Sequence, residues 1–294
     1  MAHGQIRKAL SGYYYVYDGK ELIQCRGRGV FRNRGESPLV GDLVEYTLET
    51  EGSDGTIQKI IDRQNELVRP PIANIDQGIL VFSVKEPNFN TILLDRFLVV
   101  LESFHVHPII CLTKMDLLQD DEREELQGYI ADYENIGYTV LQTYKGEEEL
   151  VERLQPILKG KTSVLAGQSG VGKSTLLNTL IPDLNLKTGI ISQSLGRGKH
   201  TTRHVELIEV CDGLLADTPG FSSFDFDEIE KEELGACFPE ITRIAEDCKF
   251  RGCLHLKEPK CAVKVAVEAG EIREYRYKHY EQFMQEIMDR KPRY

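Results

Sequence analysis

Eight consecutive residues, Gly167–Ser174, have the strongest chemical pattern in the chain. Their sequence, GQSGVGKS, combines glycines that let backbone N–H groups curve around phosphate with a lysine and a hydroxyl residue. An apolar strand is expected at residues 163–166 and a helix from Lys173 to about Leu180, so phosphates would meet the positive end of that helix. The predicted phosphate-binding residues are Gly167, Gln168, Ser169, Gly170, Val171, Gly172, Lys173, Ser174 and Thr175.

A second motif, Asp217-Thr218-Pro219-Gly220, follows the apolar stretch 213–216, about 45 residues after the phosphate loop. An aspartate at a strand end can hold Mg²⁺ through water, as the hydroxyl of Ser174 can hold it directly. The N–H of Gly220 can contact a γ-phosphate. Alone the tetrapeptide is a plain turn, but after a phosphate loop it predicts a magnesium and γ-phosphate site.

A third motif, Thr113-Lys114-Met115-Asp116, follows the apolar stretch 109–112. A carboxylate there can accept hydrogen bonds from guanine N1–H and the exocyclic amine together, a donor pair that adenine lacks. The motif therefore indicates a guanine nucleotide. Thr143-Tyr144-Lys145, after the apolar residues at 140–141, is a weaker candidate for a second guanine loop.

The order of these motifs is unusual, because the guanine motif precedes the phosphate loop by about 50 residues. In most GTPases it follows. A circular permutation explains the order, and it preserves a sheet when the original termini lie close together.

Residues 196–204, GRGKHTTRH, separate the phosphate loop from Asp217 and are expected to form a loop. Thr201 or Thr202 could close onto Mg²⁺ and the γ-phosphate, and the sequence does not distinguish them. His200 beside them is a candidate catalytic residue, although contact with solvent or RNA explains it nearly as well. Phe221 stands where Ras-like GTPases carry a glutamine that orients water, so slow unassisted hydrolysis is expected.

A cluster of three cysteines and one histidine near the C-terminus predicts a structural Zn²⁺ site with no open coordination position. The spacing departs from the common C-x2-C finger, and buried thiols are the alternative. The charged residues around the cluster argue against that alternative. The predicted ligands are Cys248, Cys253, His255 and Cys261.

The elements around these motifs indicate a multidomain α/β protein. Short strands with Gly and Asp turns fill the first 70 residues, which predicts a small β-barrel of the OB type. Arg69-Pro70-Pro71 predicts an extended linker. Strands and helices then alternate to residue 226, as in a mostly parallel sheet, and the remainder is helical and polar. Cys111 and Cys211 are expected in the core.

Composition excludes several classes of protein. The 294 residues are 41% hydrophobic and 28% charged, which excludes wholesale disorder. We expect neither a membrane span nor a signal peptide, and seven cysteines suit a reducing cytoplasm better than a disulfide framework. The net charge of −11 divides into +4 for residues 1–40, −19 for the centre and +4 for residues 248–294, so the ends are candidates for RNA contact. In the barrel the candidate RNA-binding residues are Arg26, Arg28, Arg32 and Arg34, and the tyrosine run 13–17 could stack bases.

Together, the motif order, His200-Thr201-Thr202, Phe221 after Gly220, and the zinc spacing resemble the circularly permuted ribosome small-subunit-dependent GTPase A (RsgA) family over essentially the whole chain. The resemblance implies an OB-fold domain (1–68), a permuted GTPase domain (69–226) and a zinc domain with a C-terminal helix (227–294). It also implies binding to the 30S subunit and 16S rRNA near the decoding region, late in subunit maturation. It assigns catalysis to His200. GTP hydrolysis stimulated by the subunit would then time release of the GTPase and of another assembly factor.

Two other functions compete with this one. A metabolic enzyme that phosphorylates a small molecule would need a substrate pocket, and Thr113–Asp116 favours guanine over ATP. A pure RNA-binding module with a vestigial nucleotide fold conflicts with the intact Lys173, Ser174 and Asp217. A monomer that binds GTP and GDP is the simplest expectation, and competition by alarmone nucleotides stays open.

Overall fold

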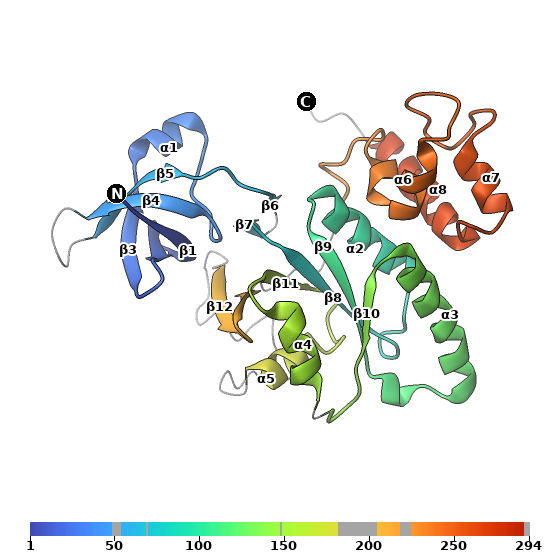
Figure 1. Ribbon diagram of the computed structural model, residues 1–294, viewed down its shortest axis with the longest axis horizontal. Coiled ribbons are helices and arrows are strands. Elements are labelled where there is room, and N and C mark those ends of the chain that lie inside the picture. Colours follow the sequence, from blue (N-terminus) through green and yellow to red (C-terminus); the bar gives the residue numbers. More distant parts are fainter. Residues whose placement is uncertain (49–53, 69, 148, 182–204, 218–224, 291–294) are drawn as a thin grey trace. The chain divides into compact units, whose positions relative to one another are not determined.

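The computed structural model describes residues 1–48, 54–68, 70–147, 149–181, 205–217 and 225–290 (Figure 1). The side chains of Arg32, Asn33, Arg34 and Asp217 also lie outside the described part. The chain forms two compact units, each made of two segments that are distant in sequence. The first unit comprises Met1–Ile79 and Gly146–Ser222, and the second comprises Leu80–Lys145 and Ser223–Tyr294.

The N-terminal part of the first unit is a five-stranded barrel. The strand order is β1-β2-β3-β5-β4, and β4 also pairs with β1, which closes the barrel. The β3–β5 pair is parallel, and the other pairs are antiparallel. This arrangement confirms the predicted OB-type barrel. Its elements are β1 (Ala2–Leu10), β2 (Tyr13–Tyr17), β3 (Leu22–Gly27), α1 (Gly29–Arg34), β4 (Leu43–Leu48) and β5 (Gly55–Ile60).

Alternation along the strands builds the core of this barrel. Val16 of β2 is fully buried, whereas Tyr13, Tyr15 and Tyr17 are half-buried on the opposite face. Cys25 of β3, which pairs with Tyr14 of β2, is also fully buried. The tyrosine run therefore contributes one β-branched residue to the core and three rings to the outer face.

A short hairpin follows the barrel and replaces the extended linker that the Pro-Pro pair predicts. It consists of β6 (Glu66–Val68) and β7 (Pro71–Ala73), and Val68 pairs with Pro71. Proline is tolerated there because it is the first residue of its strand. The linker prediction was wrong because proline restricts the backbone without fixing what the flanking residues pair with.

The rest of the first unit carries the phosphate loop. In the sheet order, β8 (Gln77–Ser83) is followed by β11 (Thr162–Ala166), β13 (Gly213–Asp217) and β12 (Glu206–Val210). β11 and β13 are parallel, and β12 is antiparallel to β13. Two helices accompany these strands, α4 (Leu150–Leu158) and α5 (Lys173–Leu180). Residues 162–166 of β11 are all buried, as expected for a central strand.

In the second unit, β8 continues beside β9 (His107–Thr113), which pairs in parallel with β10 (Thr139–Gln142). Helix α2 (Thr91–Ser103) buries Leu94, Phe97, Leu98 and Leu101, as their helical spacing predicts. Between β9 and β10 lie the short helix η1 (Met115–Leu117) and the acidic helix α3 (Asp120–Ile136), which begins with a capping box. The predicted alternation of strands and helices is confirmed.

The C-terminal segment of the second unit is helical. It contains η3 (Leu234–Cys237), α6 (Pro239–Ala245), α7 (Ala262–Glu268) and α8 (Glu274–Asp289). Arg276 of α8 is 1% exposed and makes two hydrogen bonds to Glu240 of α6, at 2.7 and 3.1 Å. Its Nη1 lies 2.5 Å from the fully buried carboxylate of Asp95 on α2. A buried ionic network therefore joins α2, α6 and α8.

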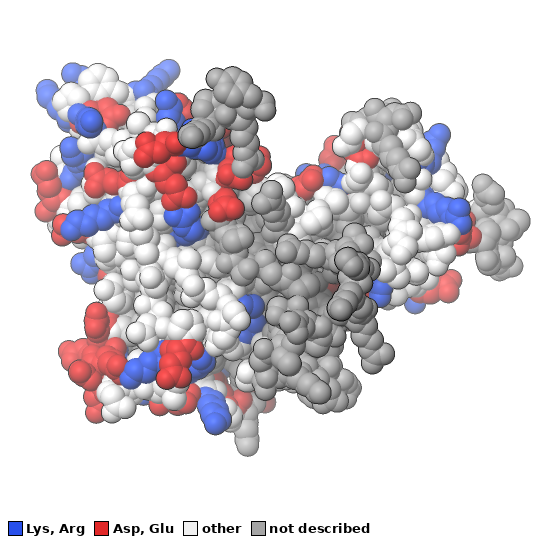
Figure 2. Space-filling view, turned by 180° about the vertical axis from the view of Figure 1, so that it is seen from behind, with Lys and Arg blue, Asp and Glu red and all other residues white. Residues whose placement is uncertain are grey.

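Three further observations bear on the predictions from the sequence. Among the residues that the structure describes, no helix has both the length and the apolar character needed to cross a membrane. On the face shown in Figure 2, basic and acidic side chains lie interspersed. Cys111 is buried as predicted, but Cys211 is only half-buried, because it lies in the turn between β12 and β13 with a φ of +49°.

Candidate functional site

The predicted phosphate loop connects β11 to α5 as its sequence indicates. Gly167 has a φ of +142°, and Gly172, the residue that precedes α5, has a φ of +104°. An L-amino acid with a side chain is strained in that region, so the glycine spacing follows from the backbone path. Val171 is buried and fixes the loop against the core. The loop therefore leads from a buried strand into the N-terminus of α5, where the helix dipole favours an anion.

The side chain of Lys173 folds back onto the phosphate loop. Its ammonium donates hydrogen bonds to the carbonyl oxygens of Gly167, at 2.5 Å, and Gln168, at 2.6 Å. Burial lowers the pKa of Lys173, and a phosphate dianion close to it would favour the charged form again. Ser174 is half-buried in the first turn of α5, and Ser169, Gly170 and Thr175 are exposed. These positions leave the loop accessible to a nucleotide.

Several predicted residues lie outside the described part of the chain. They are His200, Thr201, Thr202, Gly220 and Phe221. Asp217 is the last residue of β13, at the strand end where the sequence predicts it. Its side chain lies outside the described part.

The guanine motif begins at Thr113, the last residue of β9, in the second unit. Lys114 has a φ of +61°, and its ammonium donates hydrogen bonds to the carbonyl oxygens of Lys85 and Glu86. Met115 is fully buried and anchors the turn in the protein core, whereas Asp116 is exposed. The arrangement holds the carboxylate of Asp116 toward solvent on a rigid turn. The Lys85 and Glu86 contacts could not be found from the sequence, because backbone carbonyls carry no residue signature.

The structure brings the weaker candidate, Thr143–Lys145, against this motif. The backbone N–H of Lys145 donates to Asp116 Oδ1 at 2.9 Å, and the N–H of Met115 donates to the Thr143 carbonyl at 3.2 Å. Thr143 is buried and donates from its hydroxyl to the Leu112 carbonyl at 3.2 Å. One oxygen of Asp116 is thereby oriented by the second loop, so the two loops form a single surface with an acceptor carboxylate.

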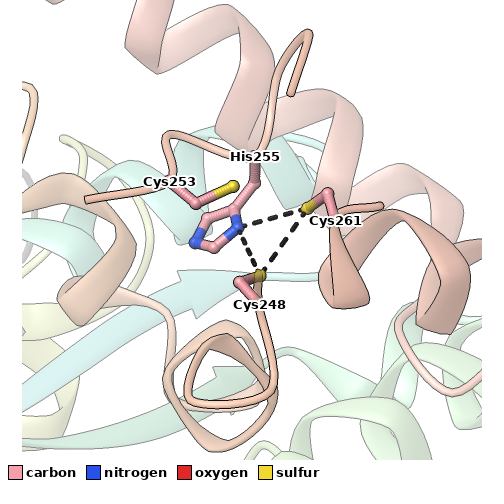
Figure 3. Close-up of side chains that lie close together, drawn as sticks. All are labelled: Cys248, Cys253, His255 and Cys261. Carbon is pink, nitrogen blue, oxygen red and sulfur yellow. Dashed lines mark hydrogen bonds between the residues drawn. The ribbon is translucent and has the colours of Figure 1, made fainter. Parts of the chain in front are cut away.

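The predicted zinc ligands converge on one point (Figure 3). The Sγ atoms of Cys248, Cys253 and Cys261 and a ring nitrogen of His255 all lie within 4.8 Å of one another. His255 Nδ1 lies 3.6 Å from Cys248 Sγ and 3.4 Å from Cys261 Sγ, and these two sulfur atoms are 3.9 Å apart. Tetrahedral Zn²⁺ with Zn–S of about 2.3 Å and Zn–N of about 2.0 Å requires edges of roughly 3.8 Å and 3.5 Å. The spacing therefore fits a four-coordinate zinc ion.

The surroundings of the cluster also suit a metal. Burial raises the pKa of the Cys253 thiol to about 12, so a cation is needed to hold it as thiolate at neutral pH. Burial lowers the pKa of His255, which favours the neutral imidazole that binds metal. Tyr277 and Tyr280 of α8 donate hydrogen bonds to the carbonyls of His255 and Leu254, at 2.6 and 2.8 Å. α8 therefore positions the loop that carries the ligands.

The candidate RNA-binding residues of the barrel have mixed environments. Arg26 is exposed, pairs with Asp54 at 3.2 Å and stacks over the ring of Tyr13, with its guanidinium carbon 4.8 Å from the ring centroid. Arg28 is exposed, and the side chains of Arg32 and Arg34 on α1 lie outside the described part. Arg7, which the sequence analysis did not select, stacks over Tyr17 at 5.0 Å. Two arginine–tyrosine pairs, Arg7–Tyr17 and Arg26–Tyr13, therefore lie on strands β1 to β3 of the barrel.

These features define a class: an OB-type barrel, a phosphate loop between a buried strand and a helix, and a guanine motif that comes earlier in the chain. The protein is a circularly permuted P-loop GTPase whose C-terminal segment carries a Cys/His cluster compatible with a zinc site. Comparison with known proteins narrows the class. A family model described as RsgA GTPase matches residues 60–227, and a model of the RsgA N-terminal domain matches residues 3–57. The chain belongs to the RsgA GTPase family.

Similar proteins cover the chain from end to end. It is 58% identical over 299 residues to a Bacillus subtilis protein named "Small ribosomal subunit biogenesis GTPase RsgA", with all of both chains covered. A Bacillus velezensis protein of the same name is 59% identical over 297 residues, again with full coverage of both.

Two solved structures are also similar to the whole chain. The structure titled "The crystal structure of YloQ, a circularly permuted GTPase" has a TM-score of 0.85 at 53% identity and covers 100% of this chain and 97% of its own. A YjeQ structure from Thermotoga maritima has a TM-score of 0.86 at 37% identity, with 99% of each chain covered. The resemblance inferred from the motif order is therefore confirmed for the fold and the family.

Proposed function

We propose that this protein is a GTPase of small-subunit maturation, which binds the 30S particle through 16S rRNA near the decoding region. The observation that carries the proposal is the similarity over the full chain to proteins named small ribosomal subunit biogenesis GTPase RsgA. Hydrolysis of GTP to GDP and phosphate, stimulated by the particle, times release of the protein and of another assembly factor. A ribosomal partner puts the protein in the cytoplasm, where we expect a monomer.

Recognition of the nucleotide divides between two loops. Residues 167–175 hold the phosphates, and the ammonium of Lys173 places its positive charge beside the oxygens of the β- and γ-phosphates. Thr113–Asp116 holds the base, and the Asp116 carboxylate accepts from guanine N1–H and the exocyclic amine. The hydrogen bond from Lys145 N–H supports this role, since it fixes one carboxylate oxygen before the base arrives. Mg²⁺, when bound, neutralises phosphate charge, and the residues proposed to hold it are Ser174, Asp217 and one of Thr201 and Thr202.

Hydrolysis is proposed to be slow in the isolated protein. Phe221 has no polar group with which to orient water. His200 is proposed to position the attacking water when the protein is bound to the 30S particle. In this arrangement the ribosome acts as the activator, and the basic ends of the chain provide its binding surfaces.

We propose three domains with boundaries at 1–68, 69–226 and 227–294. The first binds RNA, with Arg26, Arg28, Arg32 and Arg34 as candidate contacts. The last is held by one structural Zn²⁺ bound to Cys248, Cys253, His255 and Cys261, which the tetrahedral spacing of these ligands supports. The zinc carries no step of hydrolysis.

Co-sedimentation with purified 30S particles, in the presence of GDP or a non-hydrolysable GTP analogue, tests the proposed partner. We expect binding to 30S and not to 50S. Turnover of His200→Ala with 30S then tests the catalytic role. Loss of stimulation with unchanged 30S binding supports that role, and full stimulated turnover contradicts it.

A further inference from the structure

Among the described residues of the C-terminal domain 227–294, here called the zinc module, Phe250 has the one exposed aromatic ring. Phe250 is 44% exposed, whereas Phe238, Tyr280 and Phe283 of the same module are at most 1% exposed. The buried rings pack on one another, with the Phe238 and Tyr280 centroids 5.4 Å apart. The contact recorded for the Phe250 ring is instead with the ammonium of Lys249, 5.3 Å from the ring centroid. The ring therefore contributes little to the folding of this module.

Two of the predicted metal ligands flank the segment that carries this ring. Phe250 lies in the four-residue turn 249–252, which is bounded by Cys248 and Cys253. Gly252 closes the turn with a φ of +72°. Because both ends of the turn are metal ligands, zinc fixes the backbone that presents Lys249, Phe250 and Arg251 to solvent. A surface fixed in advance loses little entropy when it binds a partner.

Charge indicates the kind of partner. Residues 248–261 contain four basic side chains, all exposed, and one acidic side chain, Glu258. The carboxylate of Glu258 is turned inward. It accepts hydrogen bonds of 2.9 to 3.0 Å from the backbone N–H groups of Leu254, Leu256 and Lys257. Burial alone would raise the pKa of Glu258, but these N–H donors lower it. The outward charge of the metal loops is therefore basic in a chain whose net charge is −11. The basic side chains are Lys249, Arg251, Lys257 and Lys260.

We propose that Phe250 is a stacking surface for an unpaired RNA base, with the flanking Lys249 and Arg251 on the adjoining phosphates. An exposed ring between cations matches the way proteins bind single-stranded nucleic acid, where the aromatic face takes the base and the charges follow the backbone. The inference rests on the proposed binding to the small ribosomal subunit and deepens it. It assigns one base contact to the turn 249–252.

Equilibrium binding of the full-length, zinc-loaded protein to purified 30S particles tests this proposal. We expect Phe250→Ala and Phe250→Leu to bind roughly five- to 150-fold more weakly, as expected for the loss of one base–aromatic stack. Phe250→Tyr keeps a ring and should bind like the original protein. Val265→Ala is the matched control, because Val265 is another exposed apolar side chain of the module, at 60%. Zinc content and GDP affinity should be unchanged in all four variants.

The outcomes separate the two levels of the argument. If the original protein does not bind 30S, the proposed function fails. If it binds and Phe250→Ala binds equally well, the stacking proposal is overturned while the function stands. Retained binding by Phe250→Leu, with loss in Phe250→Tyr, would indicate an apolar protein pocket and would also overturn it. A photo-crosslinking amino acid at position 250 should label rRNA, and labelling of ribosomal protein alone contradicts the proposal.

Discussion

The buried ionic network around Arg276 predicts a large loss of stability when its cation is removed. Arg276 is 1% exposed and lies between two carboxylates, Asp95 and Glu240, which are at most 7% exposed. Asp95 also accepts from the Tyr133 hydroxyl at 2.6 Å and lies 2.5 Å from His279 Nδ1. Burial alone would lower the pKa of Arg276, but the two carboxylates raise it well above its ordinary value. The guanidinium therefore stays charged, and its removal leaves two buried anions without their counterion.

The expected magnitude follows from that imbalance. Breaking a buried ion pair by deleting one partner costs about 3–5 kcal/mol, because the remaining charge is buried without compensation. Arg276→Ala should therefore raise the local opening equilibrium of α2, α6 and α8 by roughly a hundredfold to several thousandfold. Arg273→Ala is the matched control. Arg273 immediately precedes α8 and pairs with Asp132 at 2.6 Å, but its side chain is 56% exposed. Its removal should therefore cost only about 0–1 kcal/mol of stability.

Native-state hydrogen exchange resolves the two variants. Amides of α2 and α8 should lose protection in Arg276→Ala and keep it in Arg273→Ala, while amides of the barrel strands should be unaffected in both. If Arg276→Ala loses no more protection than Arg273→Ala, the network does not stabilise this unit and the reasoning is refuted.

Two further predictions concern the metal and the base. Cys253→Ser should reduce bound zinc below one per chain and lower the hydrogen-exchange protection of α7 and α8, because three ligands no longer fill the tetrahedral site. The affinity for GDP should stay within about twofold. A variant that still binds one zinc per chain would contradict the ligand assignment. Asp116→Asn should weaken GDP binding by roughly a hundredfold or more, since two charge-assisted hydrogen bonds are lost. The same variant should bind xanthosine diphosphate, because xanthine has a hydrogen-bond acceptor where guanine has an amine. Competition binding measures both affinities, and an unchanged GDP affinity would contradict the guanine assignment.

Much of the fold could be predicted because local signals and tertiary structure agree. Three local signals predict the element that the structure forms. The glycines predict the phosphate loop before α5, the spacing of Leu94 to Leu101 predicts helix α2, and the β-favouring run Tyr13–Tyr17 predicts strand β2. The four predicted zinc ligands converge, as expected because thiols and an imidazole at that spacing have few other uses in a polar segment.

The remaining features depend on contacts that sequence spacing does not encode. Pro70 and Pro71 are part of a hairpin because residues 66–68 pair with residues 71–73. Cys211 lies in a turn because β12 ends before it. The hydrogen bond from Lys145 N–H to Asp116, and the carbonyls that hold Lys114, involve backbone groups, which no residue type marks. The Arg276 network joins residues about 180 positions apart, so no local pattern reveals it.

Multiple-turnover GTP hydrolysis by the zinc-loaded protein, alone and with 30S, 50S or 70S particles, tests the central claim most directly. Lys173→Ala provides the blank, since it removes the phosphate-binding ammonium while leaving the barrel and the zinc module in place. The account predicts slow turnover alone, strong stimulation by 30S and little by 50S. Equal rates with and without 30S would contradict a GTPase whose activator is the small ribosomal subunit.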